Sequence, residues 1–163
     1  MVSWVMNAPS VLVLAVGIGI VAGLRSLTAP AAVSWAAHLG WLNLDGGPLE
    51  FMGSVPAVAL LSLLAVVEYV ADVLPQTPRR TMPGPLAVRI VMGGLSGACL
   101  GISANQSWLV GAVLGATGGL IGAFAGYEAR RRLVNRLKVK DIVIAITEDL
   151  VALGLAYIIL VPR

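Results

Sequence analysis

Apolar residues run through most of the chain in six blocks, separated by short stretches that contain proline, charged or polar residues. The blocks lack the period-two alternation of membrane β-strands, and several approach the roughly 20 apolar residues that a helix needs to cross a bilayer. Because lipid cannot satisfy backbone hydrogen-bonding groups, we expect every block to be a helix. The predicted helices cover residues 8–24, 26–42, 55–74, 86–103, 108–127 and 142–161.

The second block is the shortest and contains Pro30. Its length is marginal for a span, so residues 26–42 either cross the membrane or form a re-entrant or interfacial helix. Trp35 and Trp41 suit the membrane interface. We favour six crossings or near-crossings, formed by five long spans and this short helix. The predicted fold is therefore all-α, a polytopic helical membrane protein with a single domain over residues 1–163.

Composition supports membrane insertion, since 58% of the residues are hydrophobic and only 12% are charged. Soluble domains carry about 25% charged residues. The net charge of +3 is concentrated in short loops, where it indicates topology rather than nucleic-acid binding. By the positive-inside rule, the basic loops 76–84 and 129–140 are expected in the cytoplasm of a multi-pass cell-membrane protein. Arg130, Arg131 and Arg132 are expected to contact anionic lipid.

Glycines recur every four residues in the fourth and fifth blocks. Such stripes allow helix backbones to approach closely in lipid. Because only residues 104–107 join these blocks, we predict a tight antiparallel hairpin. The same stripes could form an oligomer interface, so we also expect a homo-oligomer, with a dimer favoured. The stripes are Gly93, Gly97 and Gly101, then Gly111, Gly115 and Gly119, and finally Gly118, Gly122 and Gly126.

Charged residues inside the apolar blocks are the candidate site, because charges at membrane depth are expensive and are functional suspects. With both basic loops at one end, the four acids and Arg89 fall in one layer of the cytoplasmic half. Arg25, between the first two blocks, joins them if residues 26–42 cross the membrane. Four acids then face one or two arginines, although the adjacent acids of the sixth block point about 100° apart on a helix. The candidate ion- or substrate-binding residues are Arg25, Glu68, Asp72, Arg89, Glu148 and Asp149.

Two interpretations of this layer stay open. It can be an ion-pair network that only fixes helix packing. It can also be a cation or proton site, because an excess of buried carboxylates shares protons or binds a hard cation. The sequence does not decide whether a metal ion is involved. His38 is the single histidine, so one chain cannot build a multi-histidine metal site.

Enzyme chemistry has little support in the sequence. The chain has no GxSxG, CxxC, HExxH or phosphate-loop motif, and no nucleophile–base pair is visible. We expect a protein that is not an enzyme and needs no cofactor. Acids and an arginine that act on a lipid phosphate are the one enzymatic alternative.

Several motifs resemble a family of small bacterial integral membrane proteins catalogued only as a domain of unknown function (DUF4126-like). They are Ala-Gly-Leu-Arg-Ser-Leu-Thr-Ala-Pro at 22–30, Glu-Tyr-Val-Ala-Asp at 68–72, the proline-rich loop 79–85, and Gly-Tyr-Glu at 126–128. The resemblance implies a compact helical membrane protein and supplies no activity. The residues that carry over are Gly23, Arg25, Pro30, Glu68 and Asp72.

These observations favour a small ion- or proton-coupled transporter or channel component with a polar intramembrane site. The alternative is a structural or assembly membrane protein whose buried charges form a packing network.

Overall fold

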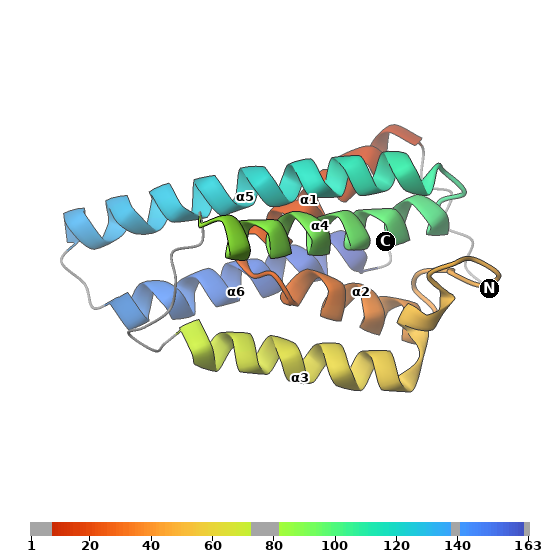
Figure 1. Cartoon of the computed structure of the whole chain (residues 1–163), viewed down its shortest axis with the longest axis horizontal. Helices are drawn as coiled ribbons and strands as arrows, with labels where there is room; N and C mark the ends of the chain where they lie inside the picture. The colour runs from red at the N-terminus through yellow and green to blue at the C-terminus, as the bar shows by residue number, and fades with distance from the viewer. Residues whose placement is uncertain (1–7, 73–81, 138–140, 162–163) are drawn as a thin grey trace.

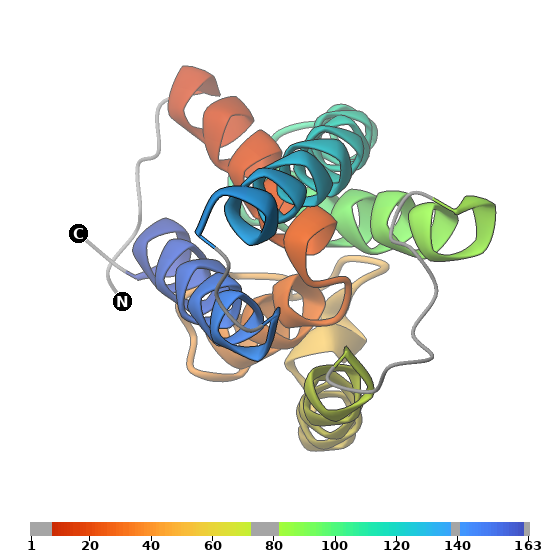
Figure 2. The ribbon, with the colours of Figure 1, turned by 90° about the vertical axis from the view of Figure 1, so that its left-hand side faces the viewer.

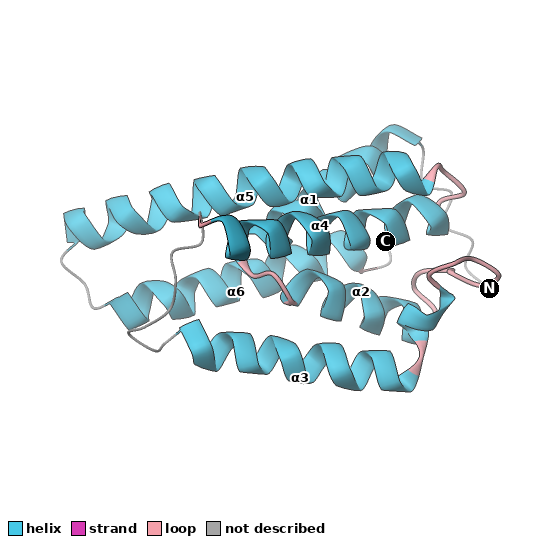
Figure 3. Cartoon of the chain, viewed as in Figure 1, coloured by secondary structure: helices cyan, strands magenta, loops and turns pink. Residues whose placement is uncertain are grey.

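A computed structural model describes residues 8–72, 82–137 and 141–161, and this part of the chain is all-helical, without a strand. Figures 1 and 3 show the helices lying side by side along one long axis. The prediction of one helix for each apolar block is confirmed. The elements are α1 (Ala8–Leu24), α2 (Thr28–His38), the 3-10 helix η1 (Glu50–Gly53), α3 (Val55–Asp72), α4 (Pro83–Ser103), α5 (Trp108–Leu137) and α6 (Asp141–Leu160).

Two helix ends differ from the prediction by four residues or more. Helix α2 ends at His38 instead of residue 42, because the chain turns back at Gly40, whose φ of +73° favours glycine. Helix α5 continues ten residues past the predicted end at Tyr127. Its basic extension is helical because Glu128 pairs with the arginines three and four positions further on.

Three helices are long and apolar enough to cross a membrane by length and composition: Pro83–Ser103, Trp108–Leu133 and Val143–Leu160. Two others, Ser10–Leu24 and Val55–Ala71, are apolar but shorter. Five long spans were predicted, so the described residues confirm three of them. The difference lies in α1 and α3, whose described apolar stretches are shorter than the usual span.

Successive helices alternate in direction along the bundle (Figure 1). The segment 39–54 and the turn 104–107 lie at one end, and the ends of α3 and α5 lie at the other. Helix α2, with 11 residues, is about 16 Å long at 1.5 Å per residue, roughly half of a bilayer core. The turn between α1 and α2 therefore lies inside the bundle.

Helix α2 belongs to the core of the bundle. Seven of its eleven residues are buried, including Ala29, Val33 and Ala36. They pack in one hydrophobic cluster with Ile18 of α1 and Leu100 of α4. Trp35 and His38 are the exposed residues of the helix, Trp35 with 48% of its surface exposed. The short helix thus fills the centre of the bundle, where its polar ends need partners.

The glycine stripes join helices of the same chain. A Cβ atom on Gly115 would lie 2.1 Å from the carbonyl oxygen of Gly93, and one on Gly19 would lie 2.1 Å from that of Gly115. A Cβ on Gly97 would meet the Gly111 carbonyl oxygen at 2.2 Å. Helix α5 therefore touches α1 and α4 backbone to backbone, and the predicted α4–α5 hairpin is confirmed. In the described part of the chain, the stripe glycines that meet another backbone meet that of the same chain, so the stripes give no support to the expected dimer.

Helix α3 lies at the margin of the bundle (Figure 2). Its main helix contact is with α2, and much of its surface is open, with Leu60, Leu63 and Val70 each more than half exposed. Three polar links join α3 to α2 and its preceding turn. They come from Ser62, Glu68 and Tyr69.

Candidate functional site

The centre of the candidate site is the break between α1 and α2, at residues 25–27. Helix α1 ends at Leu24 and α2 begins at Thr28 on the returning path. A break leaves the last carbonyl groups of one helix and the first N–H groups of the next without intrahelical partners. Inside a bundle those groups need partners from other elements, because water is scarce there.

Glu68 of α3 supplies the acceptor for the start of α2. Its Oε1 accepts from the Ser26 backbone N–H at 2.8 Å, and its Oε2 accepts from the Leu27 N–H at 2.8 Å. The Ser26 hydroxyl donates to Oε1 as well. The cap residue, Leu27, makes no side-chain cap hydrogen bond. A carboxylate from a neighbouring helix thus accepts from the two N–H groups that precede α2, and its charge suits the positive end of the helix dipole.

Arg89 of α4 donates hydrogen bonds at the C-terminal end of α1. Its Nε donates to the carbonyl oxygen of Gly23 at 3.0 Å, and its Nη1 donates to the Pro85 carbonyl at 3.3 Å. The residue is buried, with 5% exposure. A cation at a helix C-terminus is favourable because of the helix dipole. The two helix ends at the break therefore meet charges of the matching sign.

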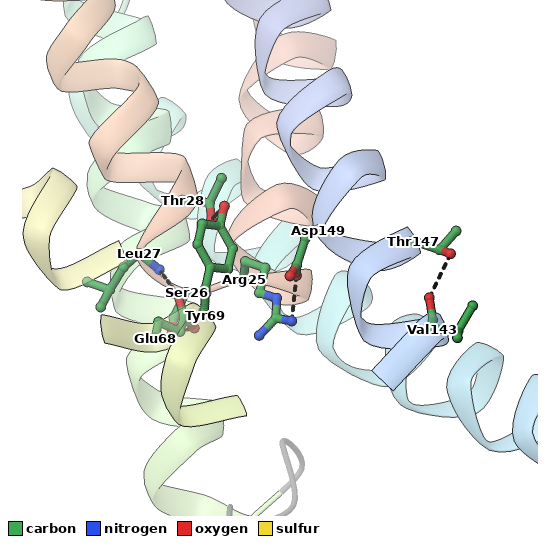
Figure 4. Close-up of polar contacts among 9 residues, drawn as sticks. All are labelled: Arg25, Ser26, Leu27, Thr28, Glu68, Tyr69, Val143, Thr147 and Asp149. Carbon is green, nitrogen blue, oxygen red and sulfur yellow. Dashed lines mark hydrogen bonds and ion pairs between the residues drawn. The ribbon is translucent and has the colours of Figure 1, made fainter. Parts of the chain in front are cut away.

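Arg25 extends from the break itself towards α6. Its Nη2 lies 2.5 Å from Asp149 Oδ1, and the arginine is fully buried whereas the aspartate side chain is 23% exposed. The guanidinium carbon lies 5.4 Å from the centre of the Tyr69 ring, within the range of a cation–π contact. Figure 4 shows Tyr69 and Glu68 of α3 on one side of Arg25 and Asp149 of α6 on the other.

The structure brings together four of the six predicted site residues, Arg25, Glu68, Arg89 and Asp149, around the break. Glu148 lies elsewhere and lines a separate pocket between α5 and α6. This follows from its position next to Asp149, because neighbouring residues of a helix point in different directions. The backbone of Asp72 ends α3, whereas its side chain lies outside the described part of the structure, as do Arg79 and Arg80. Their roles stay predictions.

Three further residues belong to this cluster. The Tyr69 hydroxyl and Thr28 Oγ1 lie 2.8 Å apart in a hydrogen bond, and Ser26 binds Glu68. The sequence does not indicate a role for Tyr69 in the site beyond its place beside Glu68, because aromatic residues commonly serve in packing. Ser26 and Thr28 stand out in the sequence only as hydroxyls between apolar runs.

An apolar groove of about 420 Å³ reaches this cluster from the side. It is lined by α2, α3 and α6, and its residues include Thr28 and Tyr69 of the cluster, together with Ala65, Trp35 and Tyr157. The cluster is therefore approached between α3 and α6, where the helices face the surroundings of the bundle. Among the described residues, no three His, Cys, Asp or Glu side chains lie close enough to hold a metal ion.

The fold and the site define a class: a small polytopic helical protein of membrane type, with a broken helix whose ends are satisfied by charged side chains of other helices. The chain belongs to the family described as Domain of unknown function (DUF4126), whose model matches residues 12–162. This confirms the resemblance seen in the sequence motifs. Neither the curated proteins nor the solved structures contain a match.

Replacing Glu68 by glutamine is expected to destabilise the protein by about 1.5–3 kcal/mol, the range for hydrogen bonds to a charged group. Glutamine has the same shape but only one acceptor oxygen, and its NH₂ group would face a backbone N–H. The measurement is the melting temperature in detergent, compared with Asp45→Asn, which neutralises an exposed loop carboxylate. Equal melting of the two variants would show that Glu68 does not stabilise the turn before α2.

Proposed function

We propose that the protein is an ion- or proton-coupled membrane transport protein, a transporter or a channel component, and that Arg25 and Asp149 form its exchangeable site. We further propose that it lies in the cell membrane with the basic stretches 76–84 and 129–140 in the cytoplasm. The observation that carries the proposal is the buried Arg25–Asp149 pair beside a helix break. Broken helices near the membrane midplane are a recurring way in which transporters hold ions and substrates.

The roles of the other charges single out this pair. Glu68 and Arg89 are each engaged by backbone groups that any stable form of the break must satisfy. Arg25 and Asp149 instead face each other through charged side-chain atoms. Protonation of the carboxylate can break such an ion pair while the hydrogen bonds at the two helix ends stay in place.

The chemistry follows from the two side chains. Arginine keeps its charge at any physiological pH, whereas a carboxylate can take up a proton. When Asp149 is protonated, the positive charge of Arg25 is no longer balanced by it, and an anion can take the carboxylate's place. Loss of the proton restores the ion pair and expels the anion. One proton and one anion would then move together.

The test uses purified protein in liposomes that contain a pH-sensitive dye. The outside solution is made more acidic than the interior, with chloride, nitrate, acetate or phosphate as the anion. Wild type should acidify the interior faster than protein-free liposomes in at least one anion. With Asp149→Asn, the rate of acidification should be lower by about tenfold or more, and tenfold corresponds to a barrier higher by about 1.4 kcal/mol. Glu128→Gln, which neutralises a carboxylate at the surface, is the matched control and should keep the rate.

The second candidate function is a structural or assembly role, and the capping contacts of Glu68 and Arg89 favour it. In that case the charges only hold the helices in register. Asp149→Asn would then melt at a lower temperature than wild type, and wild-type liposomes would acidify no faster than protein-free ones in any of the four anions. That combination would overturn the transport proposal.

A further inference from the structure

We propose that the pocket between α5 and α6 binds a phospholipid whose headgroup carries a primary amine, with the phosphate on Arg130 and the ammonium on Glu148. This site is separate from the Arg25–Asp149 pair, and the proposal does not depend on transport.

The pocket has a volume of about 340 Å³, within the range of about 300–1,000 Å³ for ligand sites. Small residues of α5, Gly126 and Ala129, form part of one wall, and valines 143 and 151 of α6 form part of the other. Leu24, at the end of α1, also lines it. The surface is thus suited to the hydrocarbon part of a lipid.

Two groups of opposite charge line this pocket, whose other residues are apolar except Thr147. Arg130 contributes from α5 and Glu148 from α6, and both are partly buried. A phosphate that is held by a guanidinium and an ammonium that is held by a carboxylate form charge-assisted hydrogen bonds, which are stronger than neutral ones. The pocket therefore matches a zwitterion better than it matches an anion or a neutral alcohol.

The three consecutive arginines of α5 are not equivalent. Arg131 and Arg132 lie near Glu128, with N–O distances of 3.5 Å and 2.7 Å, and are 60% and 69% exposed. Arg130 lines the pocket. We therefore assign lipid recognition to Arg130, in place of an even contribution from all three.

The depth of Arg130 agrees with a headgroup contact. Helix α5 starts with Trp108, a residue type that prefers the membrane interface. From there, a bilayer core of about 30 Å takes about 20 residues at 1.5 Å each, which reaches Glu128. Arg130 then lies at the level where lipid phosphates begin.

The amine distinguishes this proposal from general attraction to anionic lipid. A primary ammonium has three N–H donors for Glu148, as lysine does, whereas a quaternary choline group has none. A phosphoglycerol headgroup has no positive charge to place there. The order of binding should therefore be phosphoethanolamine lipid first, with phosphocholine and phosphoglycerol lipids behind it.

The experiment adds short-chain phosphatidylethanolamine, phosphatidylcholine or phosphatidylglycerol to the full-length protein in detergent and follows the melting temperature. Ligands that bind the folded state raise it. Phosphatidylethanolamine should reach its half-maximal shift at about tenfold lower concentration than the other two, corresponding to about 1.4 kcal/mol. Arg130→Gln should raise the half-maximal concentration of all three lipids, because it removes the phosphate contact, and Arg131→Gln, which removes the same charge one residue away, should leave these concentrations unchanged.

Equal shifts by the three lipids, or no shift at all, would overturn the proposal from the wild-type protein alone. A loss in Arg131→Gln as large as in Arg130→Gln would reduce the effect to non-specific charge attraction and would also overturn it. Glu148→Gln provides the second arm: it should bring phosphatidylethanolamine down to the level of phosphatidylcholine while phosphate binding through Arg130 persists.

Discussion

Replacing Arg25 by methionine is expected to lower the free energy of unfolding by about 3–5 kcal/mol, the range for removing one partner of a buried ion pair. The loss arises because Asp149 keeps its charge while the guanidinium that lies 2.5 Å from it is gone. The stacking of the guanidinium on Tyr69 is lost as well. The measurement is an unfolding titration in detergent, and Arg131→Met, at an arginine that is 60% exposed, is the control.

A second variant separates the ion pair from the space that Arg25 fills. Arg25→Met combined with Asp149→Leu removes both charges and keeps an apolar filling, and such replacements are often neutral or stabilising. The double variant should therefore recover most of the stability that Arg25→Met loses. If Arg25→Met destabilises no more than Arg131→Met, the pair does not hold the bundle together.

Changing Gly115 to alanine is expected to lower the free energy of unfolding by about 3 kcal/mol, the upper end for overpacked cores. The new methyl group would lie 2.1 Å from the backbone oxygen of Gly93, and a main-chain atom cannot rotate away as a side chain can. Helix α5 would have to move from α4. The melting temperature in detergent measures the effect.

Gly154 offers the matched control, because it is also inside a helix but nothing lies within 4 Å of a Cβ placed there. Gly154→Ala should leave stability unchanged or raise it by up to about 1 kcal/mol, the helix propensity difference between the two residues. A loss of stability in Gly154→Ala as large as in Gly115→Ala would mean that close packing is not the reason.

The number and order of the helices could be predicted because apolar blocks and proline-rich breaks are visible in the sequence. The helices that pack against the glycine stripes could not be predicted. A glycine such as Gly115 predicts that some backbone comes close, but it has no side chain that distinguishes a helix of the same chain from a second copy. The structure places Gly93 and Gly19 against it, so the expected dimer stays a prediction without that support.

The candidate site could be predicted in part for a similar reason. Charge in an apolar block identifies Arg25, Glu68, Arg89 and Asp149, and counting along the helices places them in one layer. The contacts of Glu68 and Arg89 could not be foreseen, because their partners are main-chain groups that every residue has. Those groups become available only where α1 breaks, and the geometry of the break decides which ones face the charges.

The reach of Glu68 to the turn between α1 and α2 also sets an order of events during biosynthesis. The carboxylate is made 42 residues after Ser26, which takes about 2–8 s at about 5–20 residues per second. During that time the N–H groups of Ser26 and Leu27 have no Glu68 to accept from them, and lipid offers no acceptor. The turn between the first two helices therefore lacks these hydrogen bonds until the third helix has been made.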